Sequence, residues 1–214
     1  MRIPTLTTNH KLRAFADEHL RYEVEMFFGA IYARRAPISS TSPDLVHFAR
    51  MARIEVFVLH LRALIFFLFP DVFRPKTHDV VAWDFIDAQD PYQEWKATRQ
   101  PISSTLKQAK VRADKEIAHL TAKRLTGAPP SKAWDDTGLG EEIRALLLVF
   151  LAEASPERIG SKVHTAIPKG ALSAEAMAPQ EGLLQGHYGE VVLTWRLGLH
   201  TRASAILVSL ASRF

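Results

Sequence analysis

Residues 54–69 read IEVFVLHLRALIFFLF, the most apolar stretch of the 214-residue chain. Only Glu55, His60 and Arg62 interrupt these 16 residues. A bilayer-spanning helix needs ~20 apolar residues, so the stretch is too short to cross a membrane. A helix that is apolar on most sides lies at the centre of a bundle, and we expect this one there.

The boundaries of this central helix can be read from its flanks. We expect it to start near Ser42, with Pro43 in its first turn, and to end at Pro70. Apolar residues at helical spacing predict three more helices: Thr8 to Arg34, Ser103 or Ser104 to about Leu125, and about Leu139 to Ala154. The sequence therefore predicts an all-α protein with a four-helix-bundle core.

Two segments fall outside this pattern. The connector from Asp71 to Pro101 has prolines and aromatic residues, so we expect short helical pieces packed on the bundle. After residue 154 the charges thin out and the periodicity weakens. We expect a bundle over residues 1–154 and a C-terminal extension over 155–214, which pads the bundle, mediates oligomerisation or is poorly ordered.

Composition narrows the classes of protein. The chain has no cysteine, which fits a reducing compartment, and its first residues (MRIPTLTTNHK) lack the apolar run of a signal peptide. We expect a cytoplasmic location. The net charge is only +4, but residues 96–132 carry nine Lys or Arg against two acids. Residues 71–95 are acidic, so this contrast indicates a polyanion site, contact between the two segments or simply a solvated charged face.

Several signatures of enzymes are absent from the sequence. There is no Gly-rich phosphate loop, no GxSxG and no HExxH, and the nine histidines lack the spacing of metal ligands. We therefore expect neither a metal nor a cofactor.

The first candidate cluster lies in the central helix. Glu55 and Arg62 are seven residues apart and share a helix face, with His60 nearby. A buried unpaired charge costs several kcal/mol. These side chains must therefore form ion pairs between helices, reach the surface or line a cleft.

The second candidate cluster is VRADKEIAHLTAKR, residues 111–124. Arg112 and His119 share a face, with Lys115 and Glu116 between them and Lys123 further along the same row. On these residues alone, a surface ladder of ion pairs such as Arg112–Glu116 explains this pattern better than catalysis does.

An Arg and a His separated by six residues, on a helix of an all-helical bundle, resemble the motif of the HEPN superfamily. EVFVLHLRALIFFLFPD (55–71), HDVVAWDFI (78–86) and ADKEIAHLTAKRL (113–125) together look like bacterial HEPN-like proteins associated with toxins or defence. The resemblance covers residues 9–154. It implies a metal-independent endoribonuclease that uses the ribose 2′-OH as nucleophile.

The resemblance also implies roles for individual residues. His119 would be the general acid or base, and Arg112 would hold the scissile phosphate. Further candidates are residues that contact the RNA backbone (Lys115, Lys123 and Arg62) and supporting residues (Asp114, Glu116, Glu55 and His60). In many active members a polar residue follows the Arg, whereas Ala113 follows here. A non-catalytic module that binds RNA, a nucleotide or a protein therefore remains an alternative.

Helix geometry suggests a homodimer. Seven residues advance ~10.5 Å along a helix, and the Arg side chain leans toward the N-terminus, away from the His. Arg112 of one chain and His119 of a second would meet more readily across a two-fold axis, as in the symmetric dimers typical of HEPN proteins. A toxin would also have an antitoxin protein as partner.

Overall fold

The computed structural model describes residues 8–38, 42–116 and 133–172. Within these ranges the chain is helical and has no strand beyond an isolated bridge between Ile86 and Ala154. The prediction of an all-α protein is confirmed. Across the same ranges, no helix combines the length and apolarity that a bilayer crossing requires.

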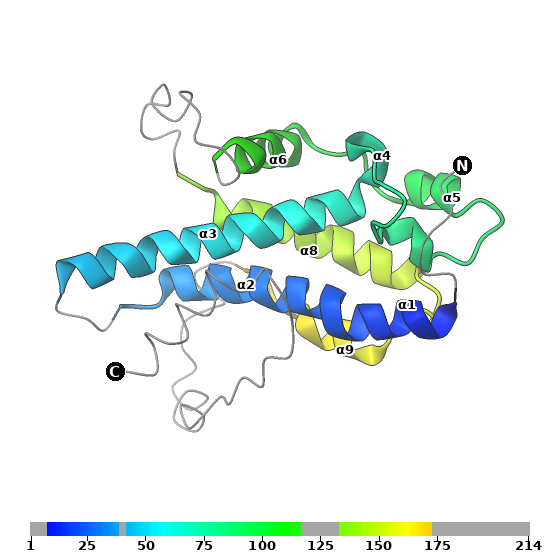
Figure 1. Cartoon of the computed structure of the whole chain (residues 1–214), viewed down its shortest axis with the longest axis horizontal. Coiled ribbons are helices and arrows are strands. Elements are labelled where there is room, and N and C mark those ends of the chain that lie inside the picture. The colour runs from blue at the N-terminus through cyan, green and yellow to red at the C-terminus, as the bar shows by residue number, and fades with distance from the viewer. Residues whose placement is uncertain (1–7, 39–41, 117–132, 173–214) are drawn as a thin grey trace.

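The central helix is α3 (Pro43–Leu68), which begins and ends as the sequence predicts. It packs against α2 (Arg21–Arg35), α6 (Ser104–Glu116) and α8 (Asp136–Glu153) (Figure 1). One side of its C-terminal half is buried, with Phe57, Leu61, Leu64 and Ile65 all inaccessible to solvent, whereas Leu59 in that half and Phe48 and Met51 in the N-terminal half are exposed. The helix is therefore central to the bundle along its second half.

The predicted first helix is interrupted by one wider turn. α1 (Asn9–Phe15) passes into a π-helical turn, η1 (Ala16–Leu20), and then into α2. The hydroxyl of Thr8 accepts a hydrogen bond from the main-chain N–H of Lys11 at 3.4 Å, which caps α1 as expected. Such π-turns add a residue to one turn of a continuous helix.

The connector between the second and third predicted helices forms short helices, as expected. These are α4 (Pro70–Phe73), the 3₁₀ helix η2 (Ala82–Phe85) and α5 (Pro91–Thr98). The Trp95 indole N–H donates to the carbonyl of Leu68 at 2.8 Å, which satisfies a carbonyl at the end of α3. The ring of Phe150 lies within 5.9 Å of the ring centroids of Phe67, Phe85 and Trp95. This aromatic cluster fixes the connector to α3 and α8.

The acidic and basic segments meet in this region. Arg99, just after α5, forms an ion pair with Asp71 in α4, and its guanidinium lies 4.4 Å from the ring centroid of Phe69. Arg99 is buried. At least one charge from each segment is therefore used in an ion pair that packs the two segments together.

Residues 155–172 belong to the same core as the bundle. After α8 comes α9 (Ser161–Ala166), and Ile159, Val163, Ile167 and Leu172 are buried in the common apolar cluster. Of the roles considered for the C-terminal extension, this part of it pads the bundle.

Candidate functional site

Arg112 is held by contacts with the segment that leads into α8. Its guanidinium carbon lies 4.0 Å from the centroid of the Trp134 ring, and its Nη1 donates to the carbonyl of Ala133 at 2.9 Å. Trp134 is itself buried, and its ring meets Phe57 of α3 edge-on at 6.2 Å. A cation over an indole face is attractive electrostatically. Arg112 therefore helps to hold Trp134 on the core.

Asp114 joins α6 to α3 through two cations. It accepts a 2.5 Å hydrogen bond from Nε of Arg62 and a 2.6 Å hydrogen bond from Nζ of Lys110. Lys110 is 5% exposed, and its ammonium also lies 4.9 Å from the ring centroid of Phe73. Burial acts to raise the pKa of Asp114, but the hydrogen bonds and charges of Lys110 and Arg62 outweigh it and lower the pKa.

The packing of α6 explains why an alanine follows Arg112. Leu106, Ala109, Lys110 and Ala113 are buried at helical spacing, and Ala113 is inaccessible to solvent. The residue after Arg112 therefore faces the core rather than the surface. A polar side chain at this position would need a buried hydrogen-bond partner.

The cluster predicted on α3 is split between different neighbours. His60 is buried and its Nδ1 lies 2.7 Å from a carboxylate oxygen of Glu23 on α2, whereas Arg62 is exposed and pairs with Asp114 on α6. Glu55 is exposed on the same helix. Of the alternatives left open for this cluster, Arg62 forms an ion pair with another helix and His60 forms a hydrogen bond with another helix, but these two side chains do not form one site.

The remaining predicted residues lie along α6 and beyond it. Lys115 is exposed near the end of the helix, and Glu116 is the last residue of α6. His119 and Lys123 lie outside the described residues. The structure therefore brings Arg62 and Asp114 together and gives Arg112 a packing partner, while the Arg112–His119 relation stays a prediction.

Sequence reasoning missed two partners of this cluster. Lys110 could have been found, because it falls within the apolar row of Leu106, Ala109 and Ala113, where a cation needs a partner. Trp134 gave no such signal, because it follows Arg112 by 22 positions and meets it only through the tertiary fold.

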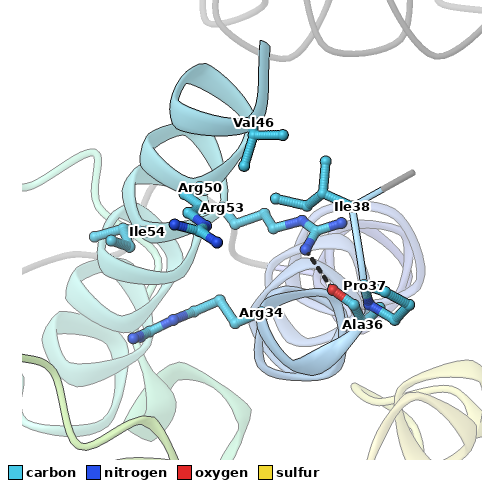
Figure 2. A pocket seen from close by; sticks show the side chains of 8 residues that line it. All are labelled: Arg34, Ala36, Pro37, Ile38, Val46, Arg50, Arg53 and Ile54. Carbon is cyan, nitrogen blue, oxygen red and sulfur yellow. Dashed lines mark hydrogen bonds between the residues drawn. The ribbon is translucent and has the colours of Figure 1, made fainter. Parts of the chain in front are cut away.

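A second feature, which the sequence reasoning also missed, is a pocket of about 360 Å³ between the end of α2 and the first half of α3 (Figure 2). Three arginines line it, Arg34 from α2 and Arg50 and Arg53 from α3. The spacing of Arg50 and Arg53 by three positions on one helix was the available signal. Arg53 donates to the carbonyl of Ala36 at 2.8 Å, next to the C-terminal end of α2.

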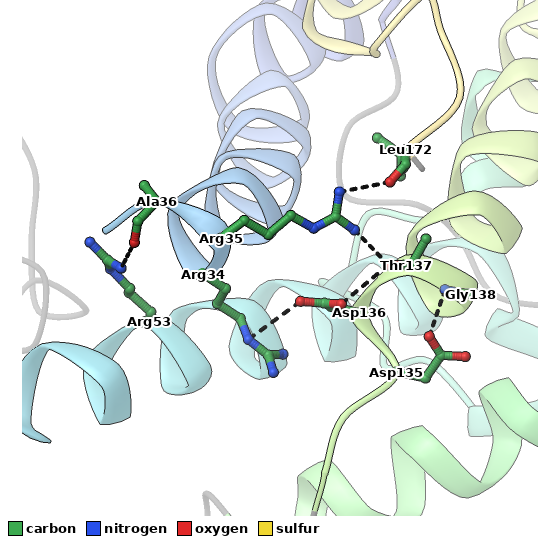
Figure 3. Close-up of polar contacts among 9 residues, drawn as sticks. All are labelled: Arg34, Arg35, Ala36, Arg53, Asp135, Asp136, Thr137, Gly138 and Leu172. Atoms are coloured by element: carbon green, nitrogen blue, oxygen red, sulfur yellow. Dashed lines mark hydrogen bonds and ion pairs between the residues drawn. The ribbon is translucent and has the colours of Figure 1, made fainter. Parts of the chain in front are cut away.

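Arg34 and Arg35 connect the end of α2 to the start of α8 (Figure 3). Arg35 donates to the hydroxyl of Thr137 at 2.5 Å and to the carbonyl of Leu172 at 2.8 Å. Nε of Arg34 lies 3.4 Å from the Asp136 carboxylate, and its guanidinium lies 5.4 Å from the ring centroid of Phe57. Arg34 and Arg112 therefore contact the same aromatic pair, Phe57 and Trp134, from two helices.

Among the described residues, no group of three or more His, Asp or Glu side chains is arranged to hold a metal ion. In comparisons with known proteins, no family model, no curated protein and no solved structure matches the chain.

Proposed function

We propose that this chain is a HEPN-like four-helix bundle that binds RNA through the outer face of α6 without cutting it. The observation that carries the proposal is the pair of exposed lysines on α6, Lys107 and Lys115, with the partly exposed Arg62 beside this helix. Arg112 is already engaged with Trp134 and Ala133 in the packing of this helix. The HEPN part of the proposal rests on the sequence resemblance of residues 9–154.

Exposed cations support the binding role. Lys107 and Lys115 are exposed on α6, and Arg62 keeps 45% of its side-chain surface accessible beside them. Lysine and arginine contacts to phosphates supply most of the affinity in sequence-independent binding of nucleic acid. A helix face with these cations fits a single-stranded or folded RNA backbone.

The neighbours of Arg112 favour binding over cleavage. Ala113 supplies no polar group after the Arg, and the Asp114 carboxylate is bound by Lys110 and Arg62. The Asp114 carboxylate would have to leave Lys110 and Arg62 before it could assist a reaction. We therefore place the non-catalytic module ahead of the endoribonuclease.

One observation favours the second candidate, a metal-independent endoribonuclease acting as a toxin or defence effector. Stacking on Trp134 immobilises the Arg112 guanidinium, and a fixed cation is suited to hold a scissile phosphate. In this case His119 would be the acid or base, and an antitoxin protein would be a partner. Both candidates include the homodimer in which the α6 helices of two chains face each other.

The binding proposal is tested by titrating fluorescently labelled single-stranded RNA with the wild type and with a Lys107→Glu/Lys115→Glu variant. Lys11→Glu/Lys162→Glu is the matched control, because both lysines are exposed but lie on α1 and α9. We expect the α6 variant alone to bind much more weakly. The salt dependence of log K should also flatten by about 0.7 per lost phosphate contact. Equal weakening by both variants would contradict a role for α6.

A further inference from the structure

The pocket between α2 and α3 has an uneven charge distribution. Its three arginines approach from two helices, and no Asp or Glu is among its described lining residues. Figure 2 shows Arg34 extending from α2 toward α3 while Arg53 extends from α3 toward Ala36. Arginine guanidinium groups that line one space are suited to hold an anion with several oxygens.

The positive charge of this pocket is only partly compensated. Arg34 has Asp136 at 3.4 Å, but the hydrogen-bond acceptor of Arg53 is a neutral carbonyl, that of Ala36. Arg50 makes no hydrogen bond or ion pair with another described residue. At least two of the three cations therefore lack a carboxylate partner in the described structure.

Burial affects two of the three arginines, Arg34 and Arg53. It lowers the pKa of the Arg53 guanidinium, because desolvation disfavours the charged form. Nη1 of Arg34 is also buried and has no hydrogen-bond partner. A purely structural role accounts for Arg53, whose N–H satisfies a carbonyl beyond the end of α2. Arg50 is exposed and contributes charge to the pocket without a hydrogen bond or ion pair to another described residue.

The rest of the lining is apolar. Ile38 and Pro37 follow α2, and Val46 and Ile54 come from α3. The volume of about 360 Å³ is at the lower end of the ~300–1,000 Å³ found for small-molecule sites. The pocket thus pairs a cationic side with an apolar side, in a space suited to a small organic molecule.

We propose that this pocket binds a phosphate monoester, with the phosphate at Arg50 and Arg53 and the organic part against Val46 and Ile54. Arg34 adds positive charge from the opposite helix, held in place by Asp136. Phosphate accepts charge-assisted hydrogen bonds from arginine, often from two N–H groups at once. The site is separate from the α6 face, and the inference does not depend on RNA binding there.

Calorimetric titration with phenyl phosphate tests this proposal, because the probe has one phosphate and one apolar ring. We expect saturable binding by the wild type and about tenfold or greater weakening in Arg50→Ala, the loss typical of one hydrogen bond to a charged group. Arg50 is exposed and makes no hydrogen bond or ion pair with another described residue, so the variant should fold normally. Arg13→Ala, an exposed arginine on α1, is the matched control and should bind as the wild type does.

Two comparisons sharpen the test. Inorganic phosphate should bind more weakly than phenyl phosphate, and equal affinity would contradict the role of the apolar side. A short 5′-phosphorylated oligoribonucleotide, compared with its 5′-hydroxyl form, distinguishes the end of an RNA from a small metabolite as the source of the phosphate. Absence of phosphate binding, or equal weakening in Arg50→Ala and Arg13→Ala, would overturn the proposal.

Discussion

Arg112 covers the face of the Trp134 ring at 4.0 Å and bonds to the carbonyl of the preceding Ala133. The two residues are 22 positions apart, and the contact joins α6 to the entry of α8. The Trp134 ring packs in turn against Phe57, and the guanidinium of Arg34 lies over the Phe57 ring. The residue expected to hold a substrate phosphate is thus also part of the packing between helices.

This contact predicts a measurable coupling between the two side chains. Arg112→Ala should lower the free energy of unfolding by about 1 kcal/mol, and Trp134→Ala by about 3–5 kcal/mol because a large buried ring is lost. Urea denaturation of both single variants and the double variant gives the coupling, which we expect to be about 0.5–1 kcal/mol. Additive effects would mean that the stacking contributes nothing to stability.

The ion-pair cluster of α6 should respond differently to loss of its anion and loss of its buried cation. Asp114→Ala leaves Lys110 buried without its carboxylate, so we expect a loss of about 1–3 kcal/mol. Lys110→Met replaces the buried stem with an apolar side chain of similar length and should cost less than Asp114→Ala. The midpoints of urea denaturation at pH 7 test this order. The reverse order would show that Lys110 stabilises the fold chiefly through its charge.

The lowered pKa of Asp114 predicts a dependence of stability on pH. Since the pKa of this carboxyl is lower in the folded than in the unfolded state, its contribution is complete above the unfolded value of about 3.9 and is lost as the pH falls through the folded value. The stability difference between wild type and Asp114→Asn should therefore narrow below about pH 4. Urea denaturation curves of both proteins from pH 7 to 2.5 measure this difference in the free energy of unfolding.

Removing the two cations that lower this pKa provides the control. In a Lys110→Met/Arg62→Met background, Asp114→Asn should change the pH profile little. If the stability difference caused by Asp114→Asn still narrows to the same extent in this background, the pH effect belongs to other groups.

Substitutions at position 113 test why an alanine follows Arg112 here, where many HEPN proteins have a polar residue. Ala113→Asn places an amide on the buried face of α6, so we expect destabilisation of about 1–3 kcal/mol, measured by thermal or urea unfolding. Ala113→Ser introduces a smaller polar group and should cost less. A stable Asn variant would show that the interface between α6 and α3 accommodates a polar group.

Much of the fold could be predicted from the sequence because its signals are local. The apolar run at 54–69, Pro43 and Pro70 mark the limits of α3, and Thr8 and Ser103 cap α1 and α6. The π-turn at Ala16–Leu20 has no equivalent signal, because it depends on how the helix fits its neighbours. The packing of residues 155–172 was one of three roles that the sequence left open, because single apolar residues, rather than a periodic stripe, anchor them.

The candidate site was less predictable, for a physical reason. Helical spacing tells which side chains share a face, as it did for Arg62 and Glu55, but not what another helix brings to that face. Asp114 as the partner of Arg62, and Trp134 as that of Arg112, depend on tertiary contacts. The arginine pocket likewise needs two helices that meet only in the folded chain.

The most direct test of RNA binding without cleavage uses the wild type and His119→Ala at protein concentrations at which the dimer forms. Each protein is incubated with end-labelled RNA in EDTA, and complex formation and RNA length are followed together. We predict that both proteins form the complex and that the RNA stays intact. Cleavage by the wild type that disappears in His119→Ala would contradict this account and establish the endoribonuclease instead.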